Sequence, residues 1–311
     1  MRLLLVVAIF FVVPCHAQEI NTSEFAKADS IVQLYPDHSI INLEILSHKL
    51  TDDLETQEGK FRSIFKWICS NISNDYVLAE SNRRKRERLT GQELVAWNSK
   101  LTLMVQSKLM NSHATVCTGY AWLIREMSAY AGITSVMVDG YGRNAQSNIG
   151  KSSLNHTWNA VQLNGKWFLC DATWSSGAVN TVNGEYIKRF DEAYFLPDPD
   201  YFIRNHYPLD VKWSLLEQPP TLVEFINRPL TYAGIFHHKV LPLTPQQFEI
   251  KVVRGETVSF HFDNPASKAI VLLVGSKKVN ATSYKFKRRG IYAVHVMTDG
   301  TPLFSYKVTV S

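Results

Sequence analysis

The stretch LNHTWNAVQLNGKWFLCDATW, residues 154–174, restricts the fold of this chain more than any other segment. Apolar and polar residues alternate on both sides of Asn164-Gly165, a dipeptide typical of the two-residue turn of a β-hairpin. With the turn centred there, paired residues have numbers that sum to about 329. His156 then opposes Thr173, and Asp171 lies on the diagonal of the same face, within reach of the ring. The pattern predicts two antiparallel strands that bring two titratable groups together.

The segment HATVCTGYAWLIREM, residues 113–127, places Cys117 at the start of a predicted helix. Helical spacing extends from Gly91 to Gly132, a residue suited to end a helix. At a helix N-terminus, the macrodipole and the free backbone N–H groups favour the thiolate form of a cysteine. A cysteine without partners is more often a buried structural residue, so a chemical role for Cys117 depends on the two hairpin residues.

Cys117, His156 and Asp171 are the three residue types of a nucleophilic triad. In such a triad the imidazole takes the thiol proton, while the carboxylate orients the ring and stabilises its charged form. The thiolate attacks an acyl carbon, and N–H groups at the helix start, including that of Cys117, can hold the oxyanion. The sequence thus predicts covalent acyl transfer with these three catalytic residues.

Three segments of the chain, VCTGYAWL, NHTWNAVQLNGKWFLCDATW and YFLPDPDYFIRNHYP, resemble the transglutaminase-like superfamily. The last segment looks most like the kyphoscoliosis-peptidase branch, which has many relatives among secreted bacterial proteins. The resemblance extends from about residue 60 to residue 216. It implies an α+β, papain-like catalytic core, in which the cysteine helix packs against an antiparallel sheet that presents the histidine and the aspartate. By position it makes Cys117 the nucleophile, His156 the base and Asp171 the orienting acid.

Two positions depart from the pattern of this family. Members often carry glycine two residues before the cysteine, where this chain has Thr115, which we expect to tighten the approach to the nucleophile. The upstream oxyanion side chain of the family is not placed by any motif; Trp97 and Gln106 are candidates, although a structural role is more usual for each. Neither departure removes a member of the triad.

The other cysteines and several conspicuous residues are predicted to be structural. Cys69 falls within the apolar stripe of a helix and Cys170 faces away from Asp171, so both are expected in the core. With Cys117 they make three thiols in the mature chain, and an odd number cannot pair completely. The remaining predictions are a turn residue (His113), a packing or hydrogen-bonding residue (His206), a surface pair that binds no metal (His237 and His238), and core or site-wall residues (Trp158 and Trp174).

Residues 1–17 are predicted to be a secretory signal peptide. A basic residue precedes an apolar run that ends at Val13, and small-residue spacing ends at Ala17. The run is too short for a permanent transmembrane helix, so no stable membrane insertion is expected. A lipoprotein anchor at Cys15 is the alternative. We therefore expect an exported protein, either periplasmic or secreted.

Two domains are predicted in the mature chain. Residues 18–220 are expected to form the transglutaminase-like catalytic domain with its N-terminal helices. Beyond about residue 221 the helical spacing disappears and short strands alternate with turn residues, which predicts a small Ig-like β-sandwich over residues 221–311.

Composition excludes several classes of protein. With 45% hydrophobic and 20% charged residues, the chain is an ordinary globular protein. Its one dense basic run, RRKRER at residues 83–88, has no interleaved aromatic residues, so we predict a solvated helix face and no nucleic-acid binding. No cofactor and no metal site are predicted. The lack of CxxC pairs disfavours an amidase of the peptide N-glycanase type, which shares the triad.

The predicted function is acyl transfer from a peptide bond or a glutamine side-chain amide of a protein or peptide substrate, through a thioester. Hydrolysis, as in a cysteine peptidase, is favoured over transglutaminase cross-linking, because acidic loops of the kind that bind calcium in animal cross-linking enzymes are not visible. The alternative from another class is a non-catalytic scaffold on the same fold. In either case the C-terminal β-domain is a candidate for docking a protein partner or the cell surface.

Overall fold

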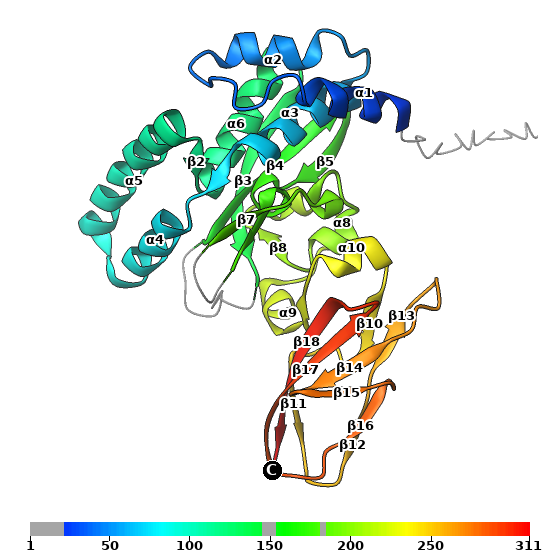
Figure 1. Ribbon diagram of the computed structural model, residues 1–311. Helices are drawn as coiled ribbons and strands as arrows, with labels where there is room; N and C mark the ends of the chain where they lie inside the picture. The colour runs from blue at the N-terminus through cyan, green and yellow to red at the C-terminus, as the bar shows by residue number, and fades with distance from the viewer. Residues whose placement is uncertain (1–21, 145–153, 181–184) are drawn as a thin grey trace, which may run out of the picture.

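The computed structural model describes residues 22–144, 154–180 and 185–311 of the 311-residue chain (Figure 1). The predicted signal peptide, residues 1–17, lies outside the described residues. Within the described ranges, no helix is both long enough and apolar enough to cross a membrane.

The first part of the chain is helical, as the apolar spacing predicts. Side-chain caps fix two of these helices, since Asn42 accepts the N–H of Ile45 and Thr56 accepts the N–H of Gly59. The helices are α1 (Thr22–Val32), α2 (Leu43–Thr51), α3 (Gln57–Asn71), α4 (Tyr76–Arg88), α5 (Gly91–Ser112) and α6 (Cys117–Tyr130). Helices α1 and α2 pack against α3, and α2 and α3 pack against α6, whereas α4 and α5 project as a separate hairpin (Figure 1).

The helical spacing from Gly91 to Gly132 corresponds to two helices, and the second begins at Cys117 as predicted. Helix α5 ends at His113, whose backbone has a left-handed φ of 47°. The short strand β2 (Ala114–Thr115) then pairs in parallel with β1 (Ser73–Asn74). Helix α6 starts only after this pairing, because the backbone remains extended through Val116. The interruption sets Cys117 at a true helix N-terminus.

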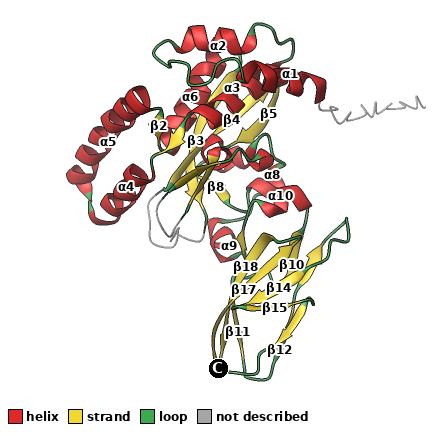
Figure 2. Cartoon of the chain, in the orientation of Figure 1, coloured by secondary structure: helices red, strands yellow, loops and turns green. Residues whose placement is uncertain are grey.

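A four-stranded antiparallel sheet with the order β5-β4-β3-β8 forms the centre of the molecule (Figure 2). The predicted hairpin register is confirmed, because Asn159 pairs with Cys170 and Gln162 pairs with Trp167. Helix α6 packs against β3 and β4. The strands are β3 (Thr134–Gly142), β4 (His156–Leu163), β5 (Lys166–Cys170) and β8 (His206–Pro208).

Short elements connect this sheet with the C-terminal region. They are α7 (Ala172–Ser176), the hairpin β6 (Gly177–Val179) and β7 (Tyr186–Lys188), the 3-10 helix η2 (Glu192–Tyr194), α8 (Pro199–Phe202) and the 3-10 helix η3 (Val211–Ser214). The prediction that helices disappear beyond residue 221 is wrong for the next 20 residues or so. Two short helices occur there, α9 (Leu222–Asn227), fixed by a capping box, and α10 (Gly234–His238). Both are too short to show a helical period.

The C-terminal region is built of strands, mostly antiparallel (Figure 1). The largest sheet has the order β11-β18-β17-β14-β15, with β9 also paired to β18; only β11 and β18 are parallel within it. Two ribbons, β10–β13 and β12–β16, lie beside it, and Phe262 of β13 stacks on Phe304 of β18. The strands are β9 (Leu230–Thr231), β10 (Leu241–Thr244), β11 (Glu249–Val252), β12 (Thr257–Ser259), β13 (His261–Asp263), β14 (Val271–Val274), β15 (Lys277–Val279), β16 (Ser283–Lys285), β17 (Gly290–Thr298) and β18 (Thr301–Val310).

Two clusters of buried side chains form the core. One lies among α1, α2, α3, α6 and the adjoining side of the central sheet. The other starts on the central sheet at Trp158 and Leu169, continues through Phe202 and Phe236, and ends between the C-terminal strands at Phe304. The boundary near residue 220 stays a prediction, but buried apolar side chains continue across it. The fold is thus α+β, with a C-terminal β region that shares a core with the central sheet.

Candidate active site

The predicted contact between His156 and Asp171 is confirmed. His156 is the first residue of β4, and its Nε2 lies 2.6 Å from Oδ2 of Asp171. The structural cause of this contact differs from the predicted one. Strand β5 ends at Cys170, and Asp171 is the N-cap of α7, so Thr173 belongs to a helix and does not oppose His156. The strand partner of His156 is Gly140 on β3.

Asp171 uses both of its carboxylate oxygens. Oδ1 accepts the backbone N–H groups of Thr173 and Trp174, at 2.8 and 3.2 Å, and so caps α7. Oδ2 accepts from His156 and also from Nε2 of His206, at 2.9 Å. Burial alone would raise the pKa of this fully buried carboxyl, but the two histidines outweigh burial and lower it. Four hydrogen bonds, two from backbone N–H groups and two from histidine rings, therefore hold the carboxylate of Asp171 in place.

His206 extends the network away from the nucleophile. Burial lowers the pKa of His206 to about 4 despite the hydrogen bond with Asp171, so the ring is neutral near pH 7. Its Nδ1 lies 2.7 Å from Oδ1 of Asn205, whose Nδ2 lies 3.2 Å from the hydroxyl of Tyr194. A neutral ring that donates Nε2–H to Asp171 needs a donor at Nδ1, so we expect the Asn205 amide to turn its NH₂ group there. The hydrogen-bonding role predicted for His206 is confirmed.

Cys117 is the first residue of α6 and lies half-buried beside His156. Burial lowers the pKa of His156, but the charge and hydrogen bond of Asp171, together with a hydrogen bond to Cys117, outweigh burial and raise it. The imidazolium form is therefore favoured, as a thiolate partner requires. Gly142 of β3 packs closely against this histidine, because a Cβ at position 142 would lie 3.0 Å from His156 Cβ.

Backbone N–H groups at the start of α6 are available for an oxyanion. The N-cap position is held by Val116, whose side chain cannot accept a hydrogen bond from the first turn. The carbonyl of Val116 accepts the N–H groups of Gly119 and Tyr120. The two preceding N–H groups belong to Cys117 and Thr118, and both of these residues line an open cleft.

An open cleft of about 780 Å³ leads to these residues. Trp174 forms part of its wall, with its ring 5.4 Å from the ring of His156, as predicted. Trp158 is 1% exposed and lies beneath the site in the core, also as predicted. The cleft is lined by residues of α4, β1, α6, β3, β4, α7 and the β6–β7 hairpin, among them Asn74, Tyr76, Arg86, Cys117, His156, Trp174 and Tyr186.

Comparison with known proteins identifies the family. Residues 45–172 match the family model described as the transglutaminase-like superfamily. The chain is also 30% identical over 217 residues to the kyphoscoliosis peptidase of Homo sapiens, an alignment that covers 69% of this chain and 30% of the relative. Residues 45–172 belong to the transglutaminase-like superfamily.

Further relatives are similar over shorter or more divergent stretches. Hillarin of Drosophila melanogaster is 33% identical over 135 residues, which are 38% of this chain and 16% of hillarin. The crystal structure of a TGase superposes with a TM-score of 0.31 at 13% identity, over 58% of this chain and 40% of that one. The chain spans less than a third of the length of the curated relatives it matches.

The departures from the superfamily pattern lie away from the cleft. Thr115 is fully buried and does not tighten the approach to Cys117, which corrects the prediction; its side chain packs against Gly119 of α6. Trp97 donates Nε1–H to Asn82, at 3.0 Å, and so joins α5 to α4. Gln106 is exposed on α5. Neither oxyanion candidate is among the described residues that line the cleft.

Sequence reasoning missed the upstream residues that do line the cleft beside Cys117. Asn74 ends β1 and Tyr76 begins α4, and both border the cleft. They reach it because β1 pairs with β2, the strand just before the nucleophile. No spacing in the sequence signals a two-residue parallel pairing between segments about 40 residues apart.

The other predicted structural residues behave as expected. Cys69 and Cys170 are fully buried, and burial raises the pKa of both thiols. His237 is exposed and contacts Asp191 at 2.8 Å. Among the described residues, the set that could ligate an ion is His156, Asp171 and His206, whose donor atoms already hydrogen-bond to one another.

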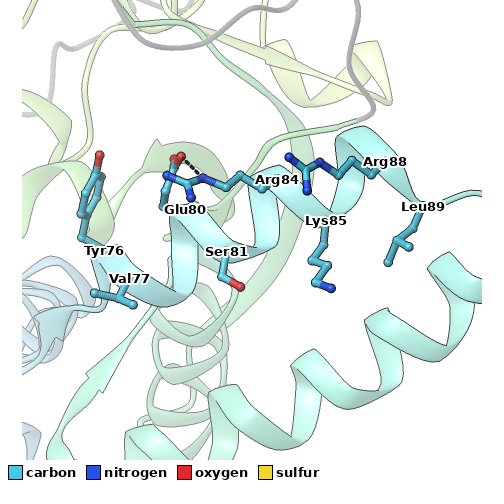
Figure 3. A pocket seen from close by; sticks show the side chains of 8 residues that line it. All are labelled: Tyr76, Val77, Glu80, Ser81, Arg84, Lys85, Arg88 and Leu89. Atoms are coloured by element: carbon cyan, nitrogen blue, oxygen red, sulfur yellow. Dashed lines mark hydrogen bonds and ion pairs between the residues drawn. The ribbon is translucent and has the colours of Figure 1, made fainter.

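The basic run of residues 83–88 lies in α4, on a helix face as predicted. Arg83 and Arg84 both pair with Glu80, at 2.7 and 2.8 Å. A pocket of about 470 Å³ lies along this helix, and Figure 3 shows Ser81 and Lys85 directed from α4 towards a neighbouring helix. Cys117 and His156 do not line this pocket, so it is separate from the triad.

Proposed function

We propose that this protein is a cysteine acyl-transfer enzyme that hydrolyses amide bonds of a protein or peptide substrate. The observation that carries the proposal is the series of contacts Cys117–His156–Asp171 at an open cleft, with a buried histidine and aspartate and with uncapped helix N–H groups beside the sulfur. A buried, ionised carboxylate behind a histidine that contacts a cysteine is costly, and it is the arrangement that nucleophilic catalysis needs.

The reaction follows from these positions. The thiolate of Cys117 attacks the substrate carbonyl carbon, and the N–H groups of Cys117 and Thr118 stabilise the oxyanion that forms. His156, as imidazolium, donates its proton to the leaving nitrogen, so an amine departs and a thioester remains. The neutral His156 then takes a proton from water, which attacks the thioester. Collapse releases a carboxylic acid and returns the proton-bearing His156 and the thiolate.

Hydrolysis is proposed in preference to cross-linking. Two relatives over 69% of the chain are named kyphoscoliosis peptidase, which supports a hydrolytic outcome. Cross-linking replaces water by a lysine amine at the thioester and uses the same triad. Export through the predicted leader, residues 1–17, is part of the proposal, and it places the substrate outside the cytoplasm.

A peptide library analysed by mass spectrometry tests the proposed function. Cleavage by the wild type should vanish in Cys117→Ala and nearly vanish in His156→Ala, while Cys69→Ser, a change at a second cysteine outside the cleft, should retain cleavage once corrected for the folded fraction. A primary amine added to the assay should not be incorporated at glutamine. Incorporation without cleavage would establish cross-linking instead.

Thiol reactivity separates an enzyme from a scaffold on this fold. If His156 holds Cys117 as thiolate, iodoacetamide at pH 6 should modify Cys117 much faster than it modifies a model thiol. His156→Ala should abolish this advantage. Equal rates for the wild type and the model thiol would favour the non-catalytic alternative.

A further inference from the structure

The positive charge of the chain is concentrated in its last 71 residues. Residues 241–311 contain ten Lys and Arg against four Asp and Glu, a formal charge of +6. The preceding 240 residues contain 23 Lys and Arg against 24 Asp and Glu, a formal charge of −1. Such an asymmetry between two parts of a chain indicates a charged partner for one of them.

The densest part of this charge lies at the end of the β region that carries residue 311, away from the helices and the cleft (Figure 1). Arg254 lies in the turn between β11 and β12, and Lys287, Arg288 and Arg289 lie in the connection between β16 and β17. Backbone hydrogen bonds join the two connections, because Gly255 N–H donates to Phe286 O at 2.7 Å. The four basic residues therefore form one group, which we call the distal basic cluster.

The distal basic cluster is not neutralised by the protein. All four side chains are exposed, and none of them forms an ion pair with a carboxylate of the described residues. Elsewhere in the region, Lys307 pairs with Glu249 and Lys268 approaches Asp299. Glu256 is the acidic side chain nearest in sequence to Arg254, and it accepts the N–H of Val253.

Two exposed aliphatic side chains accompany the cluster. Val253 is 60% exposed and Ile291 is 70% exposed. Ile291 and Lys251 both pair with Thr309 across the large sheet, so they lie in one row on one face. Val253 directly follows β11 and Arg289 directly precedes β17, each two residues along the chain from a member of this row. Exposed aliphatic residues beside arginine and lysine are typical of a surface that meets lipid.

We propose that this end of the β region binds the surface of a membrane rich in anionic phospholipid and holds the protein there peripherally. Anionic headgroups attract the distal basic cluster, and Val253 and Ile291 enter the boundary between headgroups and acyl chains. A soluble acidic polymer would match the charge but gives no reason for two exposed aliphatic side chains. The proposal is independent of the chemistry at Cys117.

Sedimentation of the whole protein with lipid vesicles tests this proposal. The wild type should bind vesicles of phosphatidylcholine mixed with phosphatidylglycerol, and should not bind phosphatidylcholine alone; added NaCl should weaken the binding. Arg288→Glu/Arg289→Glu should weaken it by about tenfold or more. Lys100→Glu/Lys188→Glu, the same change of charge at two exposed lysines of α5 and β7, should leave it unchanged. Thermal unfolding midpoints serve as the control for folding.

The variant Ile291→Ser distinguishes binding to lipid from binding to an acidic polymer. It should weaken binding to the anionic vesicles and leave the binding of soluble poly-glutamate unchanged. Equal vesicle binding by the wild type and by Arg288→Glu/Arg289→Glu would overturn the proposal. The proposal would also be overturned if the wild type bound poly-glutamate as tightly as vesicles and Ile291→Ser had no effect on either. That result would assign the surface to an acidic protein.

Discussion

The carboxylate of Asp171 has both a structural role and a role in the proposed reaction. It caps α7 through Oδ1 and binds His156 and His206 through Oδ2. The two functions can be separated by substitution, because an asparagine oxygen can still cap the helix but cannot stabilise an imidazolium by charge.

We therefore predict that Asp171→Asn lowers kcat/KM by on the order of 10⁴-fold and keeps the cap of α7, but destabilises the protein at pH 7, because the interaction of the carboxylate with the two histidines, which outweighs burial and lowers the pKa of Asp171, is lost. Asp171→Ala should reduce the rate similarly and should lower the free energy of unfolding by about 2 kcal/mol more, because the cap is lost and two buried rings lose their acceptor. Urea titration and peptide hydrolysis measure the two effects. Asp198→Asn, at the N-cap of α8, is the matched control and should change neither. A rate for Asp171→Asn within tenfold of the wild type would contradict the role of the charge.

The contact of His156 with Asp171 could be predicted from the sequence, whereas its cause could not. A two-residue turn fixes the register of a hairpin locally, so the pairing of residues 159 and 170 follows from Asn164-Gly165. The end of β5 depends on Tyr194, whose carbonyl accepts the N–H of Asp171 from 23 residues away. Local propensity contains no information about such a partner.

At the scale of elements, the start of α6 depends on a close contact between its first turn and β2. A Cβ built on Gly119 would lie 1.8 Å from Oγ1 of Thr115, so the helix and the strand approach more closely than any larger residue allows. The Oγ1 atom is buried and has no hydrogen-bond partner among the described residues. The paired strands β1 and β2 thus set the position of the nucleophile by packing.

Gly119→Ala should lower the free energy of unfolding by about 2 kcal/mol and reduce hydrolysis, because α6 must move away from β2. Thr115→Gly/Gly119→Ala removes the opposing side chain, so both stability and rate should recover in part. Chemical denaturation and kinetics on the three proteins measure this. No recovery in the double variant would show that the contact with Thr115 is not the cause.

A second element-level contact ties α1 and η2 to α3 through Arg62. Arg62 is 4% exposed, and its guanidinium lies 2.7 Å from Asp29 Oδ1 and also contacts Glu192. Burial would raise the pKa of Asp29, but the hydrogen bonds from Arg62 and Lys66 outweigh burial and lower it. A carboxyl with a lowered pKa in the folded state stabilises the protein above its unfolded pKa, about 3.9, and loses this contribution as the pH falls through the folded value.

Asp29→Asn should therefore destabilise the protein at pH 7, and the difference from the wild type should shrink as the pH falls below about 4. Unfolding midpoints in urea across this pH range provide the measurement. Asp52→Asn serves as the control, because the side chain of Asp52 is 67% exposed and its ion-pair partner is the exposed surface residue His48. A difference for Asp29→Asn that stays constant down to acid pH would mean that its charge makes no contribution.

At the scale of the whole molecule, the central sheet and the C-terminal strands share buried side chains. The sequence predicts two separate domains, since the change from helical to strand spacing near residue 221 is plain. The sequence does not predict the shared core, because the connection runs through α10, a helix of only five residues. The ring of Phe236 in this helix lies 5.1 Å from the ring of Tyr194. Tyr194 in turn contacts Asn205 behind His206.

This connection predicts that the C-terminal region supports the triad. Phe236→Ala should lower the free energy of unfolding by about 3 kcal/mol and also lower kcat/KM per folded molecule, because Tyr194 and then Asn205 lose their support. Phe286→Ala is the matched control: the ring is fully buried but contacts Tyr284 and Tyr292, far along the β region. It should destabilise the protein by a similar amount and leave kcat/KM unchanged. Equal rates for the two variants, or a fragment ending at residue 220 that keeps the stability and rate of the whole chain, would show instead that the catalytic domain is independent.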